Sequence, residues 1–246
     1  MSKLAKFFKN SKKIHDDDQI EAGRLLSDDT PFAISEAYTK ISTSIMYTPS
    51  PNKCKTIVIT SAMPGEGKSI LAINLAISLA KLSGNGKVLL IDSDMRKSRI
   101  NRLLVIDGEG NKGLYEYLSG IDDMPQTHKV NGYDNLFLLN AGAKTSNPMR
   151  FIASVRLSEM LEKFSGEYDY IIIDTPPVGV VADALLYSSV VDGYILSVRA
   201  DYSNTNLIKD AITSINGVGG NVYGVVLNSF NPKRDKRNSF YAYGKY

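Results

Sequence analysis

A short glycine-containing segment carries the residues best suited to chemistry in this sequence. Residues 61–69 are Ser-Ala-Met-Pro-Gly-Glu-Gly-Lys-Ser, and they lie between a run rich in Ile and Val and a helical pattern. A turn of this kind before a helix allows successive backbone N–H groups to surround an anion. The segment therefore predicts a loop that holds phosphate groups, in which Gly65 and Gly67 let the backbone approach them closely.

The side chains of this loop add a cation and a hydroxyl group. Lys68 is placed to reach the β- and γ-phosphates of a nucleoside triphosphate, and the Ser69 hydroxyl to ligate Mg²⁺. We therefore expect ATP and Mg²⁺ as ligands. The residues expected to hold them are Pro64, Gly65, Glu66, Gly67, Lys68, Ser69 and Ile70. A dinucleotide-binding fingerprint is disfavoured, because Ile70 stands where its third glycine would be.

Three aspartates follow two of the apolar runs. Asp92 and Asp94 come at the end of the run 88–92, and Asp174 ends the run 170–174. Because ligands bind at the carboxyl ends of the strands in open α/β sheets, we expect these carboxylates to converge beside Ser69. Asp174 is a candidate Mg²⁺ ligand; of Asp92 and Asp94, one assists the metal while the other orients or deprotonates a nucleophile. The simpler alternatives are a helix cap for Asp94 and a turn for Asp174.

The remaining apolar pattern predicts a parallel sheet covered by helices. Short runs rich in Val and Ile, without alternation, are typical of buried parallel strands. They occupy residues 56–60, 88–92, 170–174, 193–198 and 222–227, with a further candidate at 135–139. Helical patterns occupy 31–47, with Thr30 as its cap, and 69–82, 148–164, 182–188 and 205–215. The alternation predicts an α/β fold with a mainly parallel sheet and helices on both faces.

Composition limits the possible classes of protein. A chain of 246 residues with 43% hydrophobic content is long enough for one sizeable domain, which we place at residues 30–230. No apolar run approaches the 18 or so residues of a membrane-spanning helix. The formal charge of +3 is too small to indicate nucleic-acid binding, and we expect none. Cys54 stands alone, so an internal disulfide is excluded, and we expect it to be buried.

The two ends of the sequence differ from its centre. Residues 1–29 begin with lysines around Leu4, Phe7 and Phe8 and continue into three aspartates, so we expect a mobile segment. A solvated tail and a short amphipathic turn on an anionic membrane are both compatible with this pattern. After Phe230 the sequence is polar and basic, which predicts a mobile tail over residues 231–246.

These motifs together resemble the bacterial tyrosine kinases of the capsular and exopolysaccharide biosynthesis family. The resemblance covers roughly residues 30–230. It rests on residues 61–69, 92–96 (Asp-Ser-Asp-Met-Arg), 174–177 (Asp-Thr-Pro-Pro), 113–120, 147–148, 183–184 and 224–228. It implies a P-loop fold of the MinD and ParA type, and it assigns Lys68, Ser69, Asp92, Asp94 and Asp174 to the phosphate, metal and base duties argued above.

The resemblance also implies partners and acceptors. It implies transfer of phosphate from ATP to a C-terminal tyrosine cluster, here Tyr241, Tyr243 and Tyr246. The predicted strand 222–227 ends beside the nucleotide, so we expect this transfer to occur mainly from one molecule to another. A transmembrane polysaccharide co-polymerase would activate the kinase, which places it in the cytoplasm at the inner face of the membrane, and a cognate tyrosine phosphatase is a further partner. By similarity Asn228 contacts the adenine edge; the alternative is a turn residue.

The sequence departs from the family in its first predicted helix. Thr39 and Ser42 stand where the family carries the arginines of a Glu-x-x-Arg-x-x-Arg motif, so we expect a mainly monomeric or weakly associated domain.

The competing interpretation is a MinD- or ParA-like switch ATPase that regulates a membrane partner without tyrosine transfer. Such proteins usually carry an extra lysine where Met63 stands. A third interpretation, a scaffold, leaves Asp94 without a chemical task.

Overall fold

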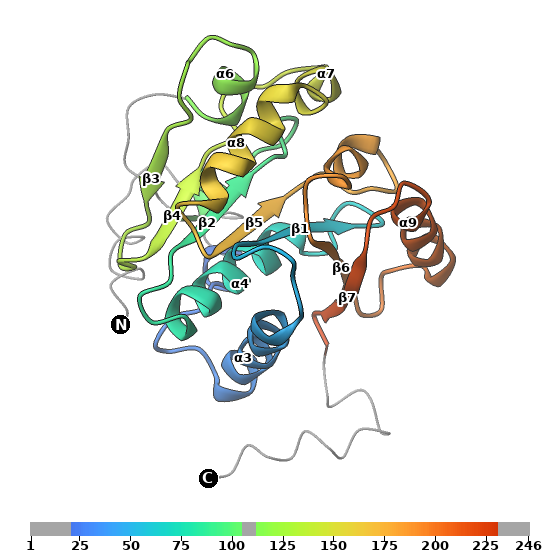
Figure 1. The fold of residues 1–246 in the computed structure, drawn as a ribbon. Helices are drawn as coiled ribbons and strands as arrows, with labels where there is room; N and C mark the ends of the chain where they lie inside the picture. The colour runs from blue at the N-terminus through green and yellow to red at the C-terminus, as the bar shows by residue number, and fades with distance from the viewer. Residues whose placement is uncertain (1–20, 105–111, 231–246) are drawn as a thin grey trace.

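A seven-stranded sheet with the strand order β3-β4-β2-β5-β1-β6-β7 forms the centre of the computed structural model, which describes residues 21–104 and 112–230 (Figure 1). Every neighbouring pair is parallel except the β3–β4 edge, which is antiparallel. The strands are β1 (Lys55–Ser61), β2 (Val88–Asp92), β3 (Thr127–Lys129), β4 (Leu136–Leu139), β5 (Tyr170–Asp174), β6 (Gly193–Arg199) and β7 (Val222–Asn228). The mainly parallel α/β fold is confirmed.

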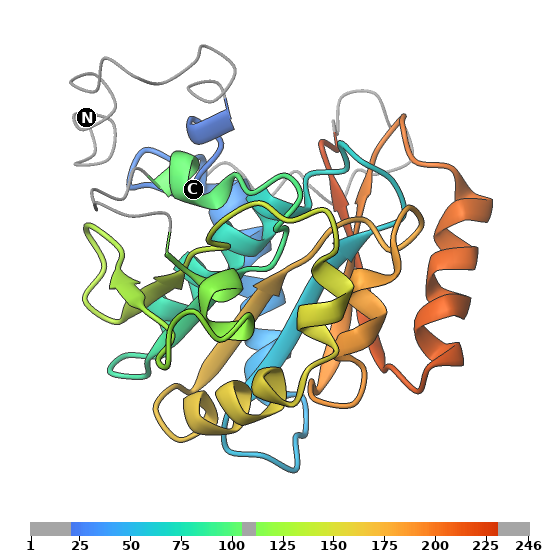
Figure 2. The same ribbon diagram turned by 90° about the horizontal axis from the view of Figure 1, so that it is seen from above.

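Helices cover both faces of this sheet (Figures 1 and 2). They are α3 (Phe32–Tyr47), α4 (Lys68–Leu82), α5 (Ile100–Leu104), α6 (Leu114–Leu118), α7 (Pro148–Ile152), α8 (Val155–Ser165), a 3₁₀ helix η1 (Ala182–Tyr187) and α9 (Thr205–Gly217). The α3, α4 and α5 helices pack on one face, and α8, η1 and α9 pack on the other. None of the helices in the described ranges is long and apolar enough to cross a membrane.

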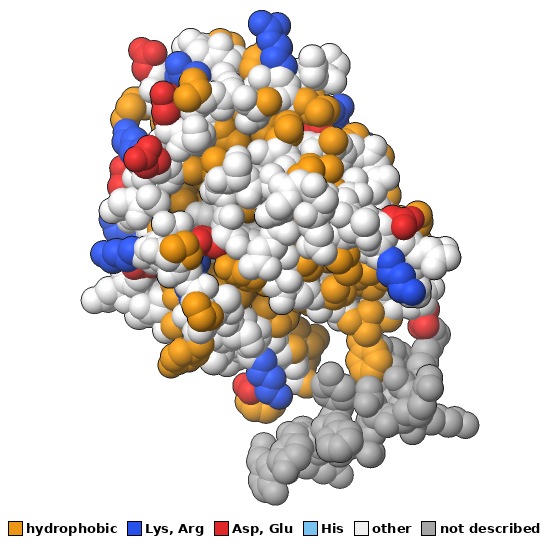
Figure 3. Space-filling view, turned by 45° about the vertical axis from the view of Figure 1, so that its right-hand side comes forward, with side chains coloured by type: hydrophobic (Ala, Val, Ile, Leu, Met, Phe, Trp, Pro, Cys, Tyr) orange, Lys and Arg blue, Asp and Glu red, His pale blue; other side chains and the backbone are white. Residues whose placement is uncertain are grey.

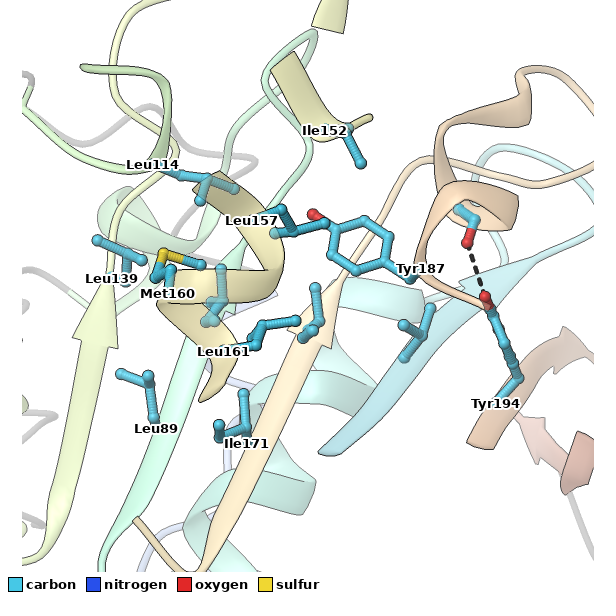
Figure 4. Close-up of a cluster of buried hydrophobic side chains, with 14 of the residues drawn as sticks. Leu89, Leu114, Leu139, Ile152, Leu157, Met160, Leu161, Ile171, Tyr187 and Tyr194 are labelled. Atoms are coloured by element: carbon cyan, nitrogen blue, oxygen red, sulfur yellow. Dashed lines mark hydrogen bonds between the residues drawn. The ribbon is translucent and has the colours of Figure 1, made fainter. Parts of the chain in front are cut away.

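The strands are apolar on both sides because each face has its own core. Along β2, Leu89 and Ile91 belong to the cluster under α8, while Val88 and Leu90 belong to the cluster under α4. Figure 4 shows α8 side chains packed over Leu89 and Ile171, with Tyr187 and Tyr194 at the far end of the same layer. Double-sided burial explains why the strands appear as unbroken apolar runs in the sequence.

Several predicted elements differ from the structure. The single helix expected at 148–164 is two helices, because Ser154 has an extended backbone between α7 and α8 and its hydroxyl donates to Phe151 O at 2.6 Å. Residues 182–187 form a 3₁₀ helix. Thr30 does not cap α3, whose N-cap is Pro31; the Thr30 hydroxyl oxygen instead accepts from Ser27 N at 2.8 Å.

The N-terminal boundary predicted at residue 30 is wrong for residues 21–29. Leu25 and Leu26 are buried in the core beside α4. The buried Asn74 of α4 accepts a hydrogen bond from Leu26 N at 2.8 Å and donates to Arg24 O at 3.0 Å. The Tyr133 hydroxyl also donates to Leu26 O at 3.3 Å, so this segment is part of the folded domain. The lysine-rich start of the chain and the C-terminal tyrosines lie outside the described residues.

The α3 helix presents Ser42 to the interior. Its side chain is fully buried, and its hydroxyl donates to Ser78 Oγ of α4 at 2.8 Å. Position 42 is therefore part of the α3–α4 contact, and a longer side chain there would have to displace α4.

Cys54 is buried, as expected, and burial raises the pKa of its thiol to about 12. On the face shown in Figure 3, Lys and Arg side chains are scattered singly among polar and hydrophobic atoms.

Candidate active site

The loop between β1 and α4 has the backbone shape of an anion-binding loop. Gly65 and Gly67 have φ angles of +81° and +83°, in the left-handed region that glycine adopts most readily. The carbonyl oxygens of residues 64–66 turn outward: Pro64 O accepts from the Tyr202 hydroxyl at 3.1 Å, and Glu66 O accepts from Ser197 Oγ at 2.7 Å. A loop whose carbonyls bond on the outer side presents its N–H groups on the inner side.

Lys68 lies between two carboxylates at the start of α4. Its Nζ is 3.1 Å from Asp94 Oδ2 and 3.5 Å from Asp174 Oδ1. The Ser69 hydroxyl donates to Asp174 Oδ2 at 2.6 Å. The meeting of these groups follows from the sheet, because Asp92 and Asp174 are register partners at the carboxyl ends of β2 and β5. The structure therefore brings Lys68, Ser69, Asp94 and Asp174 together.

The electrostatics of this cluster are set mainly by burial. Burial raises the pKa of Asp174 to about 7; Lys68 opposes the rise, and the nearby Asp92 and Asp94 add to it. For Lys68, burial lowers the pKa, but the attraction of Asp174 and Asp94 outweighs it, so the pKa is raised and the ammonium stays charged. One ammonium thus faces two buried carboxylates, and this negative site is suited to a hard cation.

Asp92 and Asp94 have different surroundings, although the sequence makes them look equivalent. Strand β2 ends at Asp92, so the two residues do not project side by side from an extended chain. The Asp92 carboxylate holds the following loop, accepting from Asp94 N at 3.1 Å and from Ser98 Oγ at 2.9 Å. Asp94 accepts from Lys97 N at 2.9 Å through Oδ1, the capping contact of a turn, while Oδ2 faces Lys68.

The carboxylates do not form a metal cluster by themselves. Within residues 21–104 and 112–230, no group of three His, Cys, Asp or Glu side chains is arranged to hold a metal ion. The groups that fit Mg²⁺ are the Ser69 hydroxyl and the Asp174 carboxylate beside it, which are oxygen donors of the kind that Mg²⁺ takes together with phosphate oxygens.

Glu66 and Asn228 support the loop from behind. The Glu66 carboxylate is 1% exposed and accepts from Met63 N at 2.8 Å and from the Ser203 hydroxyl, so it braces its own loop. Asn228 Nδ2 donates to Glu66 O at 3.1 Å and to Ser197 Oγ at 2.7 Å. A Cβ added to Gly67 would lie 3.0 Å from Asn228 Nδ2, so this amide packs directly on the loop. The Glu66 side chain is thus used within the protein, in its own loop and in the contact with Ser203.

The sequence did not single out several residues of the site. Ser197, Arg199, Tyr202 and Ser203 reach the loop because β6 lies next to β1 in the sheet, and no local motif marks that neighbourhood. A second missed feature is the two-pronged ion pair of Arg96 with the fully buried Asp183, at 2.9 and 3.1 Å. It fixes the loop after β2 to η1.

Comparison with known proteins agrees with this geometry. A family model described as an AAA domain matches residues 54–222. The tyrosine-protein kinase CpsD of Streptococcus agalactiae is 33% identical over 210 residues, which are 85% of this chain and 90% of that protein. The chain belongs to the bacterial tyrosine-protein kinases. Its enzymatic class is thus phosphoryl transfer to tyrosine, on a P-loop nucleoside-triphosphatase fold.

Solved structures show how this kinase fold is shared. The crystal structure of the chimerical protein CapA2B2 superposes with a TM-score of 0.72 at 32% identity, covering 81% of this kinase and 85% of that chain. MinD from Pyrococcus horikoshii in complex with Mg-ADP superposes with a TM-score of 0.62, covering 75% of this kinase and 73% of that chain. At 23% identity the second likeness concerns the fold alone. The expected MinD-like fold is confirmed.

Proposed function

We propose that this kinase uses ATP and Mg²⁺ to phosphorylate tyrosines of its own C-terminal tail, Tyr241, Tyr243 and Tyr246, and that it thereby regulates capsular or exopolysaccharide biosynthesis. The observation that carries the proposal is the cluster at the start of α4. There, Lys68 faces Asp94 and Asp174, and Ser69 is hydrogen-bonded to Asp174 beneath a glycine loop. This arrangement combines a phosphate cradle, a cation, a metal-binding pair and a candidate base.

Each group has a distinct task in this proposal. The loop N–H groups and Lys68 hold the β- and γ-phosphates, and Ser69 with Asp174 would hold Mg²⁺, whose charge offsets that of the transferring phosphoryl group. Asp94 is the candidate that orients or deprotonates the tyrosine hydroxyl, since its Oδ2 faces the same space as Lys68. Asp92 keeps Asp94 in place through its own hydrogen bond to the Asp94 backbone.

The position of β7 favours transfer between molecules. Asn228, the last residue of this strand, contacts the phosphate loop, so the tail begins beside the nucleotide site. The tail has 16 residues from 231 to 246, and as a flexible coil it would span roughly 22 Å. To reach its own γ-phosphate it must fold back over the loop, whereas a neighbouring molecule's tail approaches the open side directly. Thus we expect most label to be transferred in trans.

The proposed partners are those that the resemblance to the capsular and exopolysaccharide family implies. A transmembrane co-polymerase is the proposed activator, and the kinase would work in the cytoplasm at the inner face of the membrane through that partner. A cognate tyrosine phosphatase would reverse the reaction.

Incubation with Mg²⁺ and ATP followed by phosphotyrosine immunoblotting tests the function. Lys68→Met should lose the signal, and Asp94→Asn should lower its rate by orders of magnitude. Lys81→Met, which removes an exposed lysine later in α4, is the matched control and should label as the wild type does. Full labelling of folded Lys68→Met would overturn the assignment. ATP hydrolysis without any phosphotyrosine in the wild type would favour the switch ATPase instead.

A further inference from the structure

The end of β6 and the segment that follows it contact the outer side of the phosphate loop through three side chains. We propose that Arg199, Tyr202 and Ser203, here named the β6–α9 clamp, are positioning residues that hold the loop in its anion-binding shape and so set the affinity for nucleotide. This inference rests on the nucleotide site proposed above and concerns residues that no motif of the sequence marks.

Two members of the clamp cover the loop at its first left-handed glycine. The Tyr202 hydroxyl donates to Pro64 O at 3.1 Å, and Arg199 Nη1 donates to Gly65 O at 3.4 Å. The Arg199 guanidinium lies 5.2 Å from the centroid of the Tyr202 ring, so the two side chains support each other. A Cβ on Gly65 would lie 3.6 Å from the Tyr202 hydroxyl oxygen. Tyr202 and Arg199 thus cover the outer side of the loop.

Ser203 makes the contact with the largest expected effect. Its hydroxyl donates to Glu66 Oε1 and accepts from Arg199 N at 2.8 Å, which links the loop to the backbone at the end of β6. The other Glu66 oxygen accepts from Met63 N. Because a buried carboxylate is costly without its hydrogen-bond donors, loss of the Ser203 hydroxyl should make Glu66 move and carry the loop with it.

The side of the loop on which the clamp lies predicts which kinetic constant changes. In the sheet β6 lies on one side of β1. On the other side lie β5, which ends at Asp174, and β2, which is followed by the loop that contains Asp94. The clamp therefore acts on the carbonyls of Pro64 and Gly65 and on the Glu66 carboxylate, and not on the Lys68 cluster. A carbonyl that turned inward would repel a phosphate oxygen. Damage to the clamp should consequently raise KM for ATP and Kd for ADP, and leave kcat at saturating ATP nearly unchanged.

Titration of the full chain with a fluorescent ADP analogue and Mg²⁺, together with KM and kcat for ATP, tests the clamp. Ser203→Ala should weaken ADP binding and raise KM by roughly tenfold, since the free energy lost is that of a hydrogen bond to a charged group. Ser203→Thr keeps a hydroxyl and should restore most of the affinity. Ser214→Ala is the matched control, because it removes a hydroxyl that bonds Asp210 O at 2.9 Å on the exposed side of α9.

A second substitution keeps the test informative if Ser203→Ala does not fold. Tyr202→Phe removes only the hydroxyl that reaches Pro64 O and should weaken ADP binding by about fivefold, as expected for one neutral hydrogen bond. Tyr47→Phe, at a tyrosine that is 82% exposed on α3, should bind as the wild type does.

Three results would overturn the clamp. The first is that folded Ser203→Ala, or Tyr202→Phe if that variant does not fold, binds ADP as tightly as the wild type. The second is that Ser203→Ala and Ser203→Thr weaken ADP binding equally. The third is that kcat falls while KM for ATP is unchanged. Absence of ADP binding by the wild type would overturn the nucleotide site itself, and the clamp with it.

Discussion

Replacement of Asp174 by Asn should change how the stability of the protein depends on pH. Burial raises the pKa of this carboxyl from 3.8 to about 7, so the folded protein holds a proton that the unfolded chain has released over the interval between those values. The stabilising contribution of that proton is complete below pH 3.8 and is lost as the pH rises towards about 7.

The magnitude follows from the same interval. A difference of about three in pKa, at about 1.4 kcal/mol each, corresponds to at most about 4 kcal/mol of unfolding free energy. The charges of Lys68, Asp92 and Asp94 also act on this carboxyl, so the figure belongs to the cluster and not to burial alone. Asp174→Asn has no proton to lose, so its unfolding free energy relative to the wild type should increase between the two pKa values, 3.8 and about 7, and should level off above them.

Urea unfolding in EDTA, without nucleotide, measures this difference. The free energy of unfolding is determined for both proteins at several pH values across the interval, and Asp210→Asn serves as the control because Asp210 is exposed on α9. The control should follow the wild type at every pH. Parallel curves for Asp174→Asn and the wild type would refute the claim that burial of this carboxylate governs the electrostatics of the site.

Two further predictions concern the frame of the site. Arg96→Ala should lower the unfolding free energy by about 3 kcal/mol, because it leaves Asp183 buried without its partner. Arg96→Ala combined with Asp183→Asn should recover part of that loss. If the effects of the two substitutions on urea unfolding are additive, the pairing is contradicted. Gly67→Ala should cost about 1–2 kcal/mol of stability through its left-handed backbone, and it should also weaken ADP binding because the new Cβ lies 3.0 Å from Asn228 Nδ2. Gly84→Ala has a comparable backbone strain with nothing within 4 Å, so equal ADP affinities in the two variants would refute the Asn228 contact.

The parts of the fold that the sequence predicts best are those buried on both faces. The runs 88–92 and 170–174 match β2 and β5, because strands covered on both sides leave uninterrupted apolar runs. The short elements α5 and β3, of five and three residues, are too brief to show a period and were missed. The segment 21–29 was assigned to a mobile arm because the residues that it contacts, Asn74 and Tyr133 among them, lie far along the chain.

In the site, too, the sequence predicts the residues of one contiguous motif better than residues that the fold brings together. The glycine loop, Lys68 and Ser69 are a local pattern and were found directly. The β6–α9 clamp was missed because it depends on the order of strands in the sheet, which local sequence does not reveal. The difference between Asp92 and Asp94 was also missed, since it depends on the residue at which β2 ends. The different roles of these two aspartates depend on the backbone between them, which the sequence alone does not define.

Transfer of phosphate to the tail of a second molecule is the central claim, and one mixing experiment tests it directly. An inactive Lys68→Met chain with its tail intact is incubated with Mg²⁺, ATP and an active chain that ends at Phe230, and phosphorylated residues are mapped by mass spectrometry. The account predicts phosphate on Tyr241, Tyr243 or Tyr246 of the inactive chain. An unlabelled tail in that mixture, while the wild type alone labels at a rate independent of dilution, would contradict it.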